Sequence, residues 1–369
     1  MIQIRKNRLF VLVFTFLCTI NFLFAQNWQL NNFKKQDNQN PILSPSLSQE
    51  FLCPVSGKKV FWEARNVLNP CVVLVSKVSK VSKVESKVFC LLYRAQDSTG
   101  MSRIGLATSS DGIHFKKNPK PILFPDKDEF LKYEQKGGIE DPRIVQTEDG
   151  GYFLTYTSYD GKTARLCGAF SKDLLTWTKI GPLFKSEKYI NLWSKSGALV
   201  VENIGTSMIS KKINGFYWMY FGDTNLFLAK STDLKNWEIC EDEENKERIA
   251  VLGPRKGYFD SRLVEPGPYA LLTQQGILML YNGSNSLNFG TSQFPKFTYS
   301  AGQALFSSKE PYKLLKRTDN PFIWPNKDYE KVGEVNEVCF IEGLAHVGKK
   351  WYLYYGTADS KIAVAIKDK

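Results

Sequence analysis

Two adjacent carboxylates, Glu140 and Asp141, stand directly before Pro142 and Arg143. A proline fixes its own φ and disfavours the helical conformation in the residue before it, so Asp141 is expected at the mouth of a strand. A carboxyl group placed there can serve as a general acid or base once its surroundings shift its pKa. The plainer interpretation is a strand start at which Asp141 pairs with Arg143, and the rest of the chain decides between the two.

Four other segments begin in a similar way, with a polar residue shortly before an apolar run that carries Gly or Pro. The residues that open them are Asn69, Lys195, Glu265 and Glu342. If these positions converge in space, their carboxylates repel one another, and the loss of solvent raises the pKa of at least one. The set would then supply an acid and a base near neutral pH.

The elements that must position these residues repeat along the chain. Each polar-to-apolar run is followed by an aromatic segment of strand-forming composition and then by a second apolar segment. The aromatic segments are residues 88–95, 152–157, 216–222, 277–283 and 351–356, and the segments after them are residues 104–111, 166–173, 226–233, 301–308 and 362–368.

The five copies predict an all-β fold, a five-bladed β-propeller. They recur at roughly 60 to 75 residues, which suits one four-stranded blade with its loops. The polar-to-apolar runs are expected to be the innermost strands, so that Asp141 and its four counterparts meet at one end of the central channel. A Ser-Lys-Val triplet repeat at residues 75–84 is interpreted as an extended, solvated hairpin without a catalytic role.

The N-terminus predicts export. Residues 1–25 carry basic side chains, then an apolar stretch that ends at a small residue, as in a cleaved secretory signal peptide; an uncleaved anchor is the alternative. Residues 26–60 are expected to form a lead-in segment and residues 61–369 a single catalytic propeller domain. The protein is therefore expected in the periplasm or outside the cell, with no membrane span after the signal is removed.

Composition argues against several classes of function. The net charge is +12, but the basic residues are scattered and the protein is predicted to be exported, so a nucleic-acid partner is not expected. The chain has only two histidines, which offers little material for a metal site or a Ser-His-Asp triad, and we expect no metal and no cofactor. Its cysteines are irregularly spaced and favour buried thiols over disulfides.

The surroundings of the expected channel favour a sugar as the ligand, because polyhydroxylated rings need charged hydrogen-bonding groups and flat aromatic faces. Charged residues near the strand mouths are Arg94, Arg143, Asp223, Asp260 and Asp359. Aromatic residues on nearby connections are Trp62, Tyr159, Trp193, Tyr258 and Phe259. Any single aromatic residue among these could instead pack within a blade.

At this point the chain resembles glycoside hydrolase family 130, the five-bladed propellers that act on β-mannosides. The resemblance runs from about residue 61 to residue 365, and its most specific mark is the stretch from Gly138 to Ile144. Supporting marks are Asn69-Pro70 with Tyr93-Arg94-Ala95, Phe259-Asp260-Ser261, Tyr281-Asn282-Gly283, Tyr329-Glu330 with Gly333, and Tyr354-Tyr355-Gly356 with Ala358-Asp359.

The resemblance implies roles for individual residues. Asp141 would be the general acid, acting through a sugar hydroxyl, and Lys195 falls at a lysine that serves phosphate in the phosphorylases of the family. Glu140 is expected to bind or orient. The substrate-binding residues predicted on this basis are Asn69, Arg94, Glu140, Arg143, Lys195, Asp260, Asn282 and Asp359.

Departures from the phosphorylase pattern favour an inverting β-mannoside hydrolase that takes an oligosaccharide substrate. Asn282 stands where phosphorylases tend to have a histidine that helps to hold phosphate, and Glu265 and Glu342 add carboxylates that would repel phosphate. Glu265 and Glu342 are predicted to share the activation of water, with inversion usually needing about 6.5–9.5 Å between the acid and the base. The alternatives are a phosphorylase that uses Lys195 and Arg165 for phosphate, and a non-catalytic glycan-binding propeller.

Overall fold

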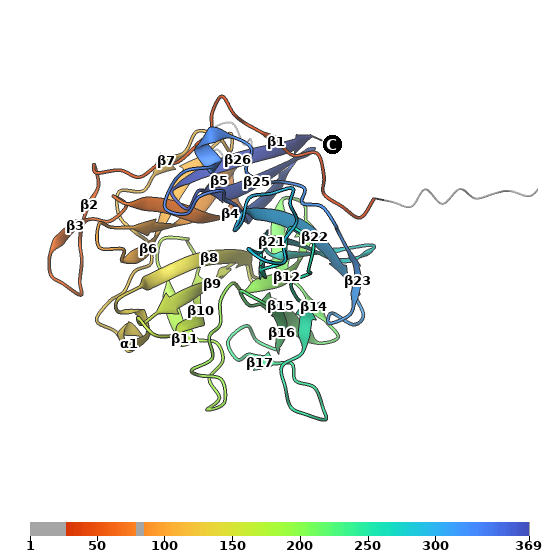
Figure 1. The fold of residues 1–369 in the computed structure, drawn as a ribbon. Helices are drawn as coiled ribbons and strands as arrows, with labels where there is room; N and C mark the ends of the chain where they lie inside the picture. The colour runs from red at the N-terminus through yellow and green to blue at the C-terminus, as the bar shows by residue number, and fades with distance from the viewer. Residues whose placement is uncertain (1–26, 79–84, 369) are drawn as a thin grey trace, which may run out of the picture.

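The computed structural model describes residues 27–78 and 85–368. The predicted signal peptide, residues 1–25, lies outside the described residues, as does the middle of the Ser-Lys-Val repeat. The strands are arranged around a central axis (Figure 1). Helix is confined in the described residues to α1 (Leu131–Glu134) and one 3-10 turn, η1 (Asp328–Glu330). The predicted all-β propeller fold is confirmed.

The strand pairings form five antiparallel sheets in chain order, each running from an inner to an outer strand. The first holds β4 (Asn66–Val78), β5 (Glu85–Gln96), β6 (Ser102–Ser109) and β7 (Lys116–Lys117). The second holds β8 (Gly138–Gln146), β9 (Tyr152–Tyr159), β10 (Ala164–Ser171) and β11 (Thr178–Pro182). The third holds β12 (Ala198–Ile204), β15 (Phe216–Phe221), β16 (Leu226–Ser231) and β17 (Glu238–Ile239).

The fourth sheet holds β19 (Leu263–Pro266) and β20 (Ala270–Thr273) as its inner edge, then β21 (Gly276–Ser284), β22 (Tyr299–Phe306) and β23 (Leu314–Arg317). The fifth holds β24 (Cys339–Val347), β25 (Lys350–Thr357), β26 (Lys361–Asp368) and β1 (Lys34–Lys35). The remaining strands are β2 (Glu50–Leu52), β3 (Lys59–Phe61), β13 (Ser207–Ser210), β14 (Lys212–Ile213) and β18 (Ala250–Leu252). The predicted inner strands are therefore the inner strands of the structure.

The second strand of each sheet is the aromatic segment of the repeat, and its side chains fill the space between sheets. Each of these strands holds at least one fully buried tyrosine: Tyr93, Tyr156, Tyr220, Tyr281, and both Tyr354 and Tyr355 in β25. The inner strands β8 and β24 are buried along almost their whole length. This layering explains why the period of the sequence repeat is visible in the aromatic residues.

A buried polar contact that the sequence did not reveal recurs in four of the sheets. A fully buried carboxylate just before the inner strand accepts a tyrosine hydroxyl from the second strand and pairs with a cation from the outer strand. We call this arrangement the polar clasp. The clasps are Glu63 with Tyr93 and Lys117, Glu134 with Tyr156 and Lys179, Asp260 with Tyr281 and Arg317, and Glu330 with Tyr355 and Lys35.

Each clasp ties the connection before a sheet to the second and outer strands of that sheet. A buried carboxylate is costly unless it is paired and hydrogen-bonded, so every member of a clasp depends on the others. The third sheet lacks this arrangement: its buried tyrosine, Tyr220, donates instead to the backbone carbonyl of Pro311 at 2.7 Å.

The N-terminal segment belongs to the propeller. β1 pairs with β26 as the outer strand of the last sheet (Figure 1). Lys35 of β1 supplies the cation of that sheet's clasp, 2.7 Å from Glu330. The predicted lead-in segment at residues 26–60 thus contributes the outer strand of the last sheet, and its boundary with the propeller domain at residues 61–369 stays a prediction. A strand of only two residues leaves no recognisable pattern in the sequence, so β1 was not predicted as part of the propeller.

Candidate active site

A cavity of about 130 Å³ lies at one end of the propeller axis, where side chains from all five sheets meet. It is lined by Leu68, Asn69, Arg94, Asp141, Lys195, Glu265, Tyr299, Val338, Phe340 and Asp359. Of the residues predicted to converge, Asn69, Asp141, Lys195 and Glu265 do so, and Arg94 and Asp359 join them. We call this cavity the axial pocket.

Register shifts in the strand pairing turn some of these side chains toward the axis. The pairing of inner and second strands shifts register between Leu68 and Cys71, between Glu140 and Arg143, and between Ile341 and Gly343. Asn69 and Asp141 sit in two of these bulges with left-handed φ values of 50° and 49°. A bulge turns a side chain out of the pleat, and the proline that follows each residue needs no ladder hydrogen bond there. The two residues thus lie within strands, rather than at their first positions as the sequence predicted.

Asp141 is buried among three hydrogen-bonding groups. Asn69 Nδ2 donates to Asp141 Oδ1 at 2.6 Å, Arg94 Nη1 lies 2.9 Å from the same oxygen, and Lys195 Nζ lies 3.2 Å from Oδ2. Burial alone would raise the pKa of Asp141, but Lys195, Arg94 and Arg143 outweigh it and hold the pKa well below its usual range. With the cations in these positions, Asp141 is ionised.

Glu265 faces the same pocket in a different electrostatic setting. Its carboxylate accepts a hydrogen bond from the Ser196 hydroxyl and lies near Lys195. Burial raises the pKa of Glu265, although Lys195, Arg143 and the Ser196 hydroxyl oppose the rise. A carboxylate that is hydrogen-bonded in one orientation and has a raised pKa is suited to accept a proton from water.

Glu342 does not line the axial pocket. It is 1% exposed, and its Oε1 lies 2.8 Å from Arg143 Nη2. Neither oxygen accepts a well-aligned hydrogen bond from the described residues. Burial raises the pKa of Glu342 well above its ordinary value, although Arg143 opposes this. The structure brings Glu265 to the pocket and leaves Glu342 behind it, so this placement does not support the predicted sharing of the base role.

Three predicted substrate-binding residues are used by the protein itself. Arg143 donates to the carbonyl oxygens of Gly267 and Pro266 at 2.8 and 2.6 Å. Asn282 exchanges two hydrogen bonds with the backbone of Ile341. Asp260 belongs to the clasp of the fourth sheet. None of the three lines the axial pocket.

Arg143 nevertheless positions the pocket, because it fixes the chain directly after Glu265 and pairs with Glu342. Glu140 lies next to the pocket and receives a hydrogen bond from Arg94 Nη2 at 2.7 Å. Arg94 thus bridges the adjacent carboxylates of Glu140 and Asp141.

Asp359 presents its carboxyl group to the pocket from a strained turn, in which Ala358 and Asp359 both have left-handed φ values, of 46° and 48°. Burial raises the pKa of Asp359 to about 6, although Arg94 opposes the shift. Such a group can donate a hydrogen bond when protonated and accept one when ionised.

The sequence did not identify the aromatic wall of the pocket. Tyr299 and Phe340 line it with ring centroids 5.9 Å apart. Phe340 stands two residues before Glu342 on an inner strand, but the register shift between Ile341 and Gly343 breaks the alternation that would otherwise place both on one face. Two of the aromatic residues that the sequence nominated, Trp62 and Phe259, are buried within the sheets. Trp193 is exposed and donates to Asp223 at 2.7 Å.

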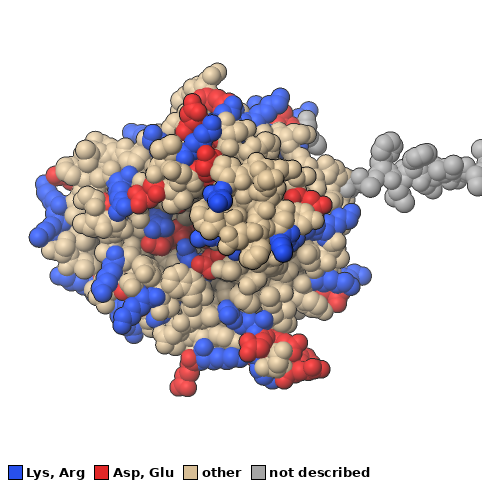
Figure 2. Space-filling model, viewed as in Figure 1, with Lys and Arg blue, Asp and Glu red and all other residues tan. Residues whose placement is uncertain are grey.

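Within residues 27–78 and 85–368, no cluster of His, Cys, Asp or Glu side chains is arranged to hold a metal ion. In the same ranges, no helix is long and apolar enough to cross a membrane. Lys and Arg are dispersed among Asp and Glu on the face shown in Figure 2, rather than gathered into a single basic patch.

A β-propeller with carboxylates, cations and an aromatic wall converging in an axial pocket defines a carbohydrate-active propeller. The chain belongs to glycoside hydrolase family 130: the family model described as beta-1,4-mannooligosaccharide phosphorylase matches residues 33–369. The family acts on glycosides, so the protein is a member of an enzyme family of phosphorylases and hydrolases.

Proteins similar to this chain are described as phosphorylases or as hydrolases. A 1,2-beta-oligomannan phosphorylase of Thermoanaerobacter is 28% identical over 90% of this chain and 96% of its own length. A putative glycoside hydrolase of Parabacteroides distasonis is 42% identical, with a TM-score of 0.86 over 93% of this chain and 98% of that one. A third structure, 40% identical with a TM-score of 0.88 over 93% and 95% of the two chains, was reported with the finding that the GH130 family of mannoside phosphorylases contains hydrolases that target beta-1,2 mannosidic linkages in Candida mannan.

Proposed function

We propose that this protein is an inverting β-mannoside hydrolase, and that the charge balance of the axial pocket carries this conclusion. Two cations, Arg94 and Lys195, face three carboxylates, Asp141, Glu265 and Asp359. Both cations are already paired with Asp141. A phosphate dianion would meet an excess of negative charge and no uncommitted cation among the residues that line the pocket, whereas a water molecule would meet a raised-pKa carboxylate.

Glu265 is the proposed base. The Ser196 hydroxyl orients its carboxylate, which takes a proton from the water that attacks the anomeric carbon. Arg143, through the carbonyl oxygens of Pro266 and Gly267, keeps the chain after Glu265 in place. We leave Glu342 out of the reaction because it lies behind the pocket.

Asp141 is the proposed acid, acting through a sugar hydroxyl. Lys195 and Arg94 keep it ionised, so it takes up a proton from the solvent when the substrate hydroxyl replaces one of those contacts. The hydroxyl then protonates the leaving oxygen and recovers its proton from Asp141. Asn69 and Asp359 bind further hydroxyls, and the rings of Tyr299 and Phe340 pack against the carbon face of the sugar.

The proposed substrates are β-1,2-linked mannosides outside the cytoplasm. The similarity to the structure reported with hydrolases that target beta-1,2 mannosidic linkages supports the linkage. The predicted signal peptide supports a periplasmic or extracellular location, where the supply of phosphate is less assured.

A β-mannoside phosphorylase is the second candidate, because curated relatives with 26–30% identity are mannoside phosphorylases and Lys195 is present. The deciding experiment incubates the protein with β-1,2-mannobiose and β-1,4-mannobiose, with and without phosphate, and identifies the products. We expect free mannose at a rate independent of phosphate, with inverted configuration at the anomeric carbon by NMR. Mannose 1-phosphate formed only when phosphate is supplied would establish the phosphorylase instead.

A further inference from the structure

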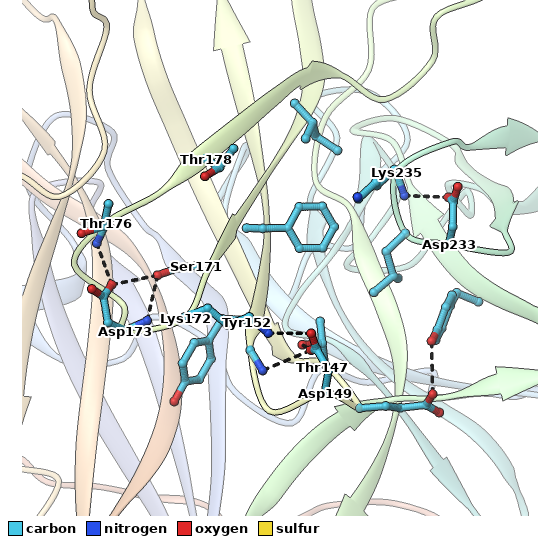
Figure 3. A pocket seen from close by; sticks show the side chains of 16 residues that line it. Thr147, Asp149, Tyr152, Ser171, Lys172, Asp173, Thr176, Thr178, Asp233 and Lys235 are labelled. Carbon is cyan, nitrogen blue, oxygen red and sulfur yellow. Dashed lines mark hydrogen bonds and ion pairs between the residues drawn. The ribbon is translucent and has the colours of Figure 1, made fainter.

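A second cavity, of about 720 Å³, lies between the second and third sheets (Figure 3). It is lined by turns at the ends of β8, β10 and β16 and by the start of β15. We call it the inter-sheet groove. Its volume falls within the range of about 300–1,000 Å³ that is usual for ligand clefts, whereas the axial pocket holds only about 130 Å³.

The groove and the axial pocket are at opposite ends of the strands. β8 passes the axial pocket at Asp141 and reaches the groove at Thr147. Six residues of extended chain span about 20 Å at about 3.3 Å per residue. A ligand in the groove would therefore leave the reacting atoms untouched.

The floor of the groove is apolar and partly aromatic. Phe170, Ile180 and Leu234 contribute to it, with the rings of Tyr152 and Tyr217 at its sides. Phe170 packs on Phe153 in the interior at a centroid distance of 4.8 Å, which fixes the orientation of its ring. Fixed aromatic rings lose little conformational freedom when a ligand packs against them.

Acidic side chains around the groove already have partners within the protein. Asp149 pairs with Lys172, and Asp173 and Asp233 occupy matching turns in which each accepts backbone N–H groups two and three residues further on. These bonds hold the pKa of Asp233 at about 2 and keep its carboxylate ionised, although its partial burial opposes the shift. An anionic or cationic chain would find few uncompensated charges here.

Uncharged ligands that carry hydroxyl groups fit the groove better than charged ligands do. Thr176 and Thr178 line one side of the groove and Asp233 and Lys235 the other (Figure 3). Threonine hydroxyls and the carboxylate of Asp173 can exchange hydrogen bonds with uncharged hydroxyl groups, while the apolar floor accepts the carbon faces of rings. This pairing of ring faces with hydroxyl partners is the chemistry of a carbohydrate chain.

We propose that the inter-sheet groove is a second, non-catalytic site that binds an uncharged oligosaccharide chain. The choice of a mannoside chain rests on the proposed function; the groove itself does not depend on it. The site would hold a long substrate to the protein while the axial pocket acts on another part of it, or on another chain.

The test uses variants that fill or flatten the groove without touching the axial pocket. Thr178→Arg fills it from an exposed position, and Phe170→Ala removes the ring from its floor. Tyr312→Ala is the matched control, since Tyr312 is an exposed aromatic residue in the turn after β22, at the same end of the propeller but in another sheet. All are compared in a Glu265→Gln background, so that the probe is not degraded, by retention in gels that contain β-1,2-mannan.

We expect Thr178→Arg and Phe170→Ala to weaken retention by about tenfold, as the loss of one anchoring side chain does, and Tyr312→Ala to leave it unchanged. In the otherwise native protein, Thr178→Arg should turn over mannobiose at the native rate. Retention that is equal in all variants, with melting temperatures intact, would overturn the groove proposal. A protein that turns over mannobiose neither with nor without phosphate would overturn the proposed function alone, because retention is measured independently.

Discussion

Replacing Glu342 by glutamine tests whether Glu342 acts as a base or only supports the pocket. Glu342 is 1% exposed and lies 2.8 Å from Arg143, and burial raises its carboxyl pKa well above the ordinary value. Glutamine keeps the size of this side chain and removes a charge that burial already disfavours, so the exchange should disturb little. Glu265→Gln, in contrast, removes a carboxylate that lines the axial pocket.

The expected magnitudes differ widely. General acid–base catalysis contributes about 10²–10⁴-fold to a rate, so Glu265→Gln should lower kcat on β-1,2-mannobiose by that factor. Glu342→Gln should lower kcat by at most about tenfold, or about 1.4 kcal/mol in the activation barrier. Arg143 keeps its hydrogen bonds to Pro266 and Gly267 in that variant, and these fix the chain after Glu265.

The assay is the initial rate of mannose release, measured together with thermal unfolding of both variants. A fall in kcat near 10³-fold for Glu342→Gln, with an unchanged melting temperature, would show that Glu342 itself activates water and would refute the separation. A loss of about 3–5 kcal/mol in stability would show instead that a buried ion pair had been broken. That result would show that Arg143 needs the charge of Glu342, and would contradict the expected tolerance of the exchange.

Three further predictions follow from the geometry. Asp141→Asn should lower kcat by about 10²–10⁴-fold while the protein still binds mannobiose, as measured by calorimetry; native turnover would remove Asp141 from the acid role. Burial raises the pKa of Glu134 to about 7, although Lys179 opposes it, so the folded protein binds that proton more tightly than the unfolded chain does. Its contribution to stability should therefore fall as pH rises from about 4.5 to about 7, and Glu134→Gln should flatten that part of a melting-temperature profile against pH. Lys35→Met should cost about 3–5 kcal/mol in unfolding free energy because Glu330 is left buried without its cation, whereas the exposed neighbour Lys34→Met should cost less than about 1 kcal/mol; equal losses would contradict the clasp.

The sequence predicted the fold well because its aromatic strands are local and repeat. Asp141, Lys195 and Glu265 converge as expected, since inner strands of a propeller share one axis. Glu342 was assigned to the pocket on the same logic, but it does not line the pocket, and Asn282, assigned from the family resemblance, bonds to the backbone of Ile341 instead. A shift of one residue at a bulge moves a side chain from one face of a strand to the other, and no local pattern reveals that shift.

The polar clasps were invisible for a different reason. Glu63 and Tyr93 are 30 residues apart in the sequence, and Glu330 and Lys35 are 295 apart, so neither contact leaves a spacing that sequence inspection could detect. Asp260 was predicted to bind the substrate because it is charged, lies near a strand mouth and belongs to a segment that resembles the family. Only the fold shows that the carboxylate of Asp260 is already paired with Arg317 and hydrogen-bonded by Tyr281.

The contact between Lys35 and Glu330 also sets an order of assembly. β1 leaves the ribosome before any other strand of the propeller, but its partners in β26 are residues 365 and 366, at the far end of the chain. Contacts between distant parts of a chain are slow to form because a large loop must close first. The ring of sheets is therefore expected to close late, and until then the outer edge of β26 stays open to pairing with other chains. A protein built in this way links its solubility to the completion of its last sheet.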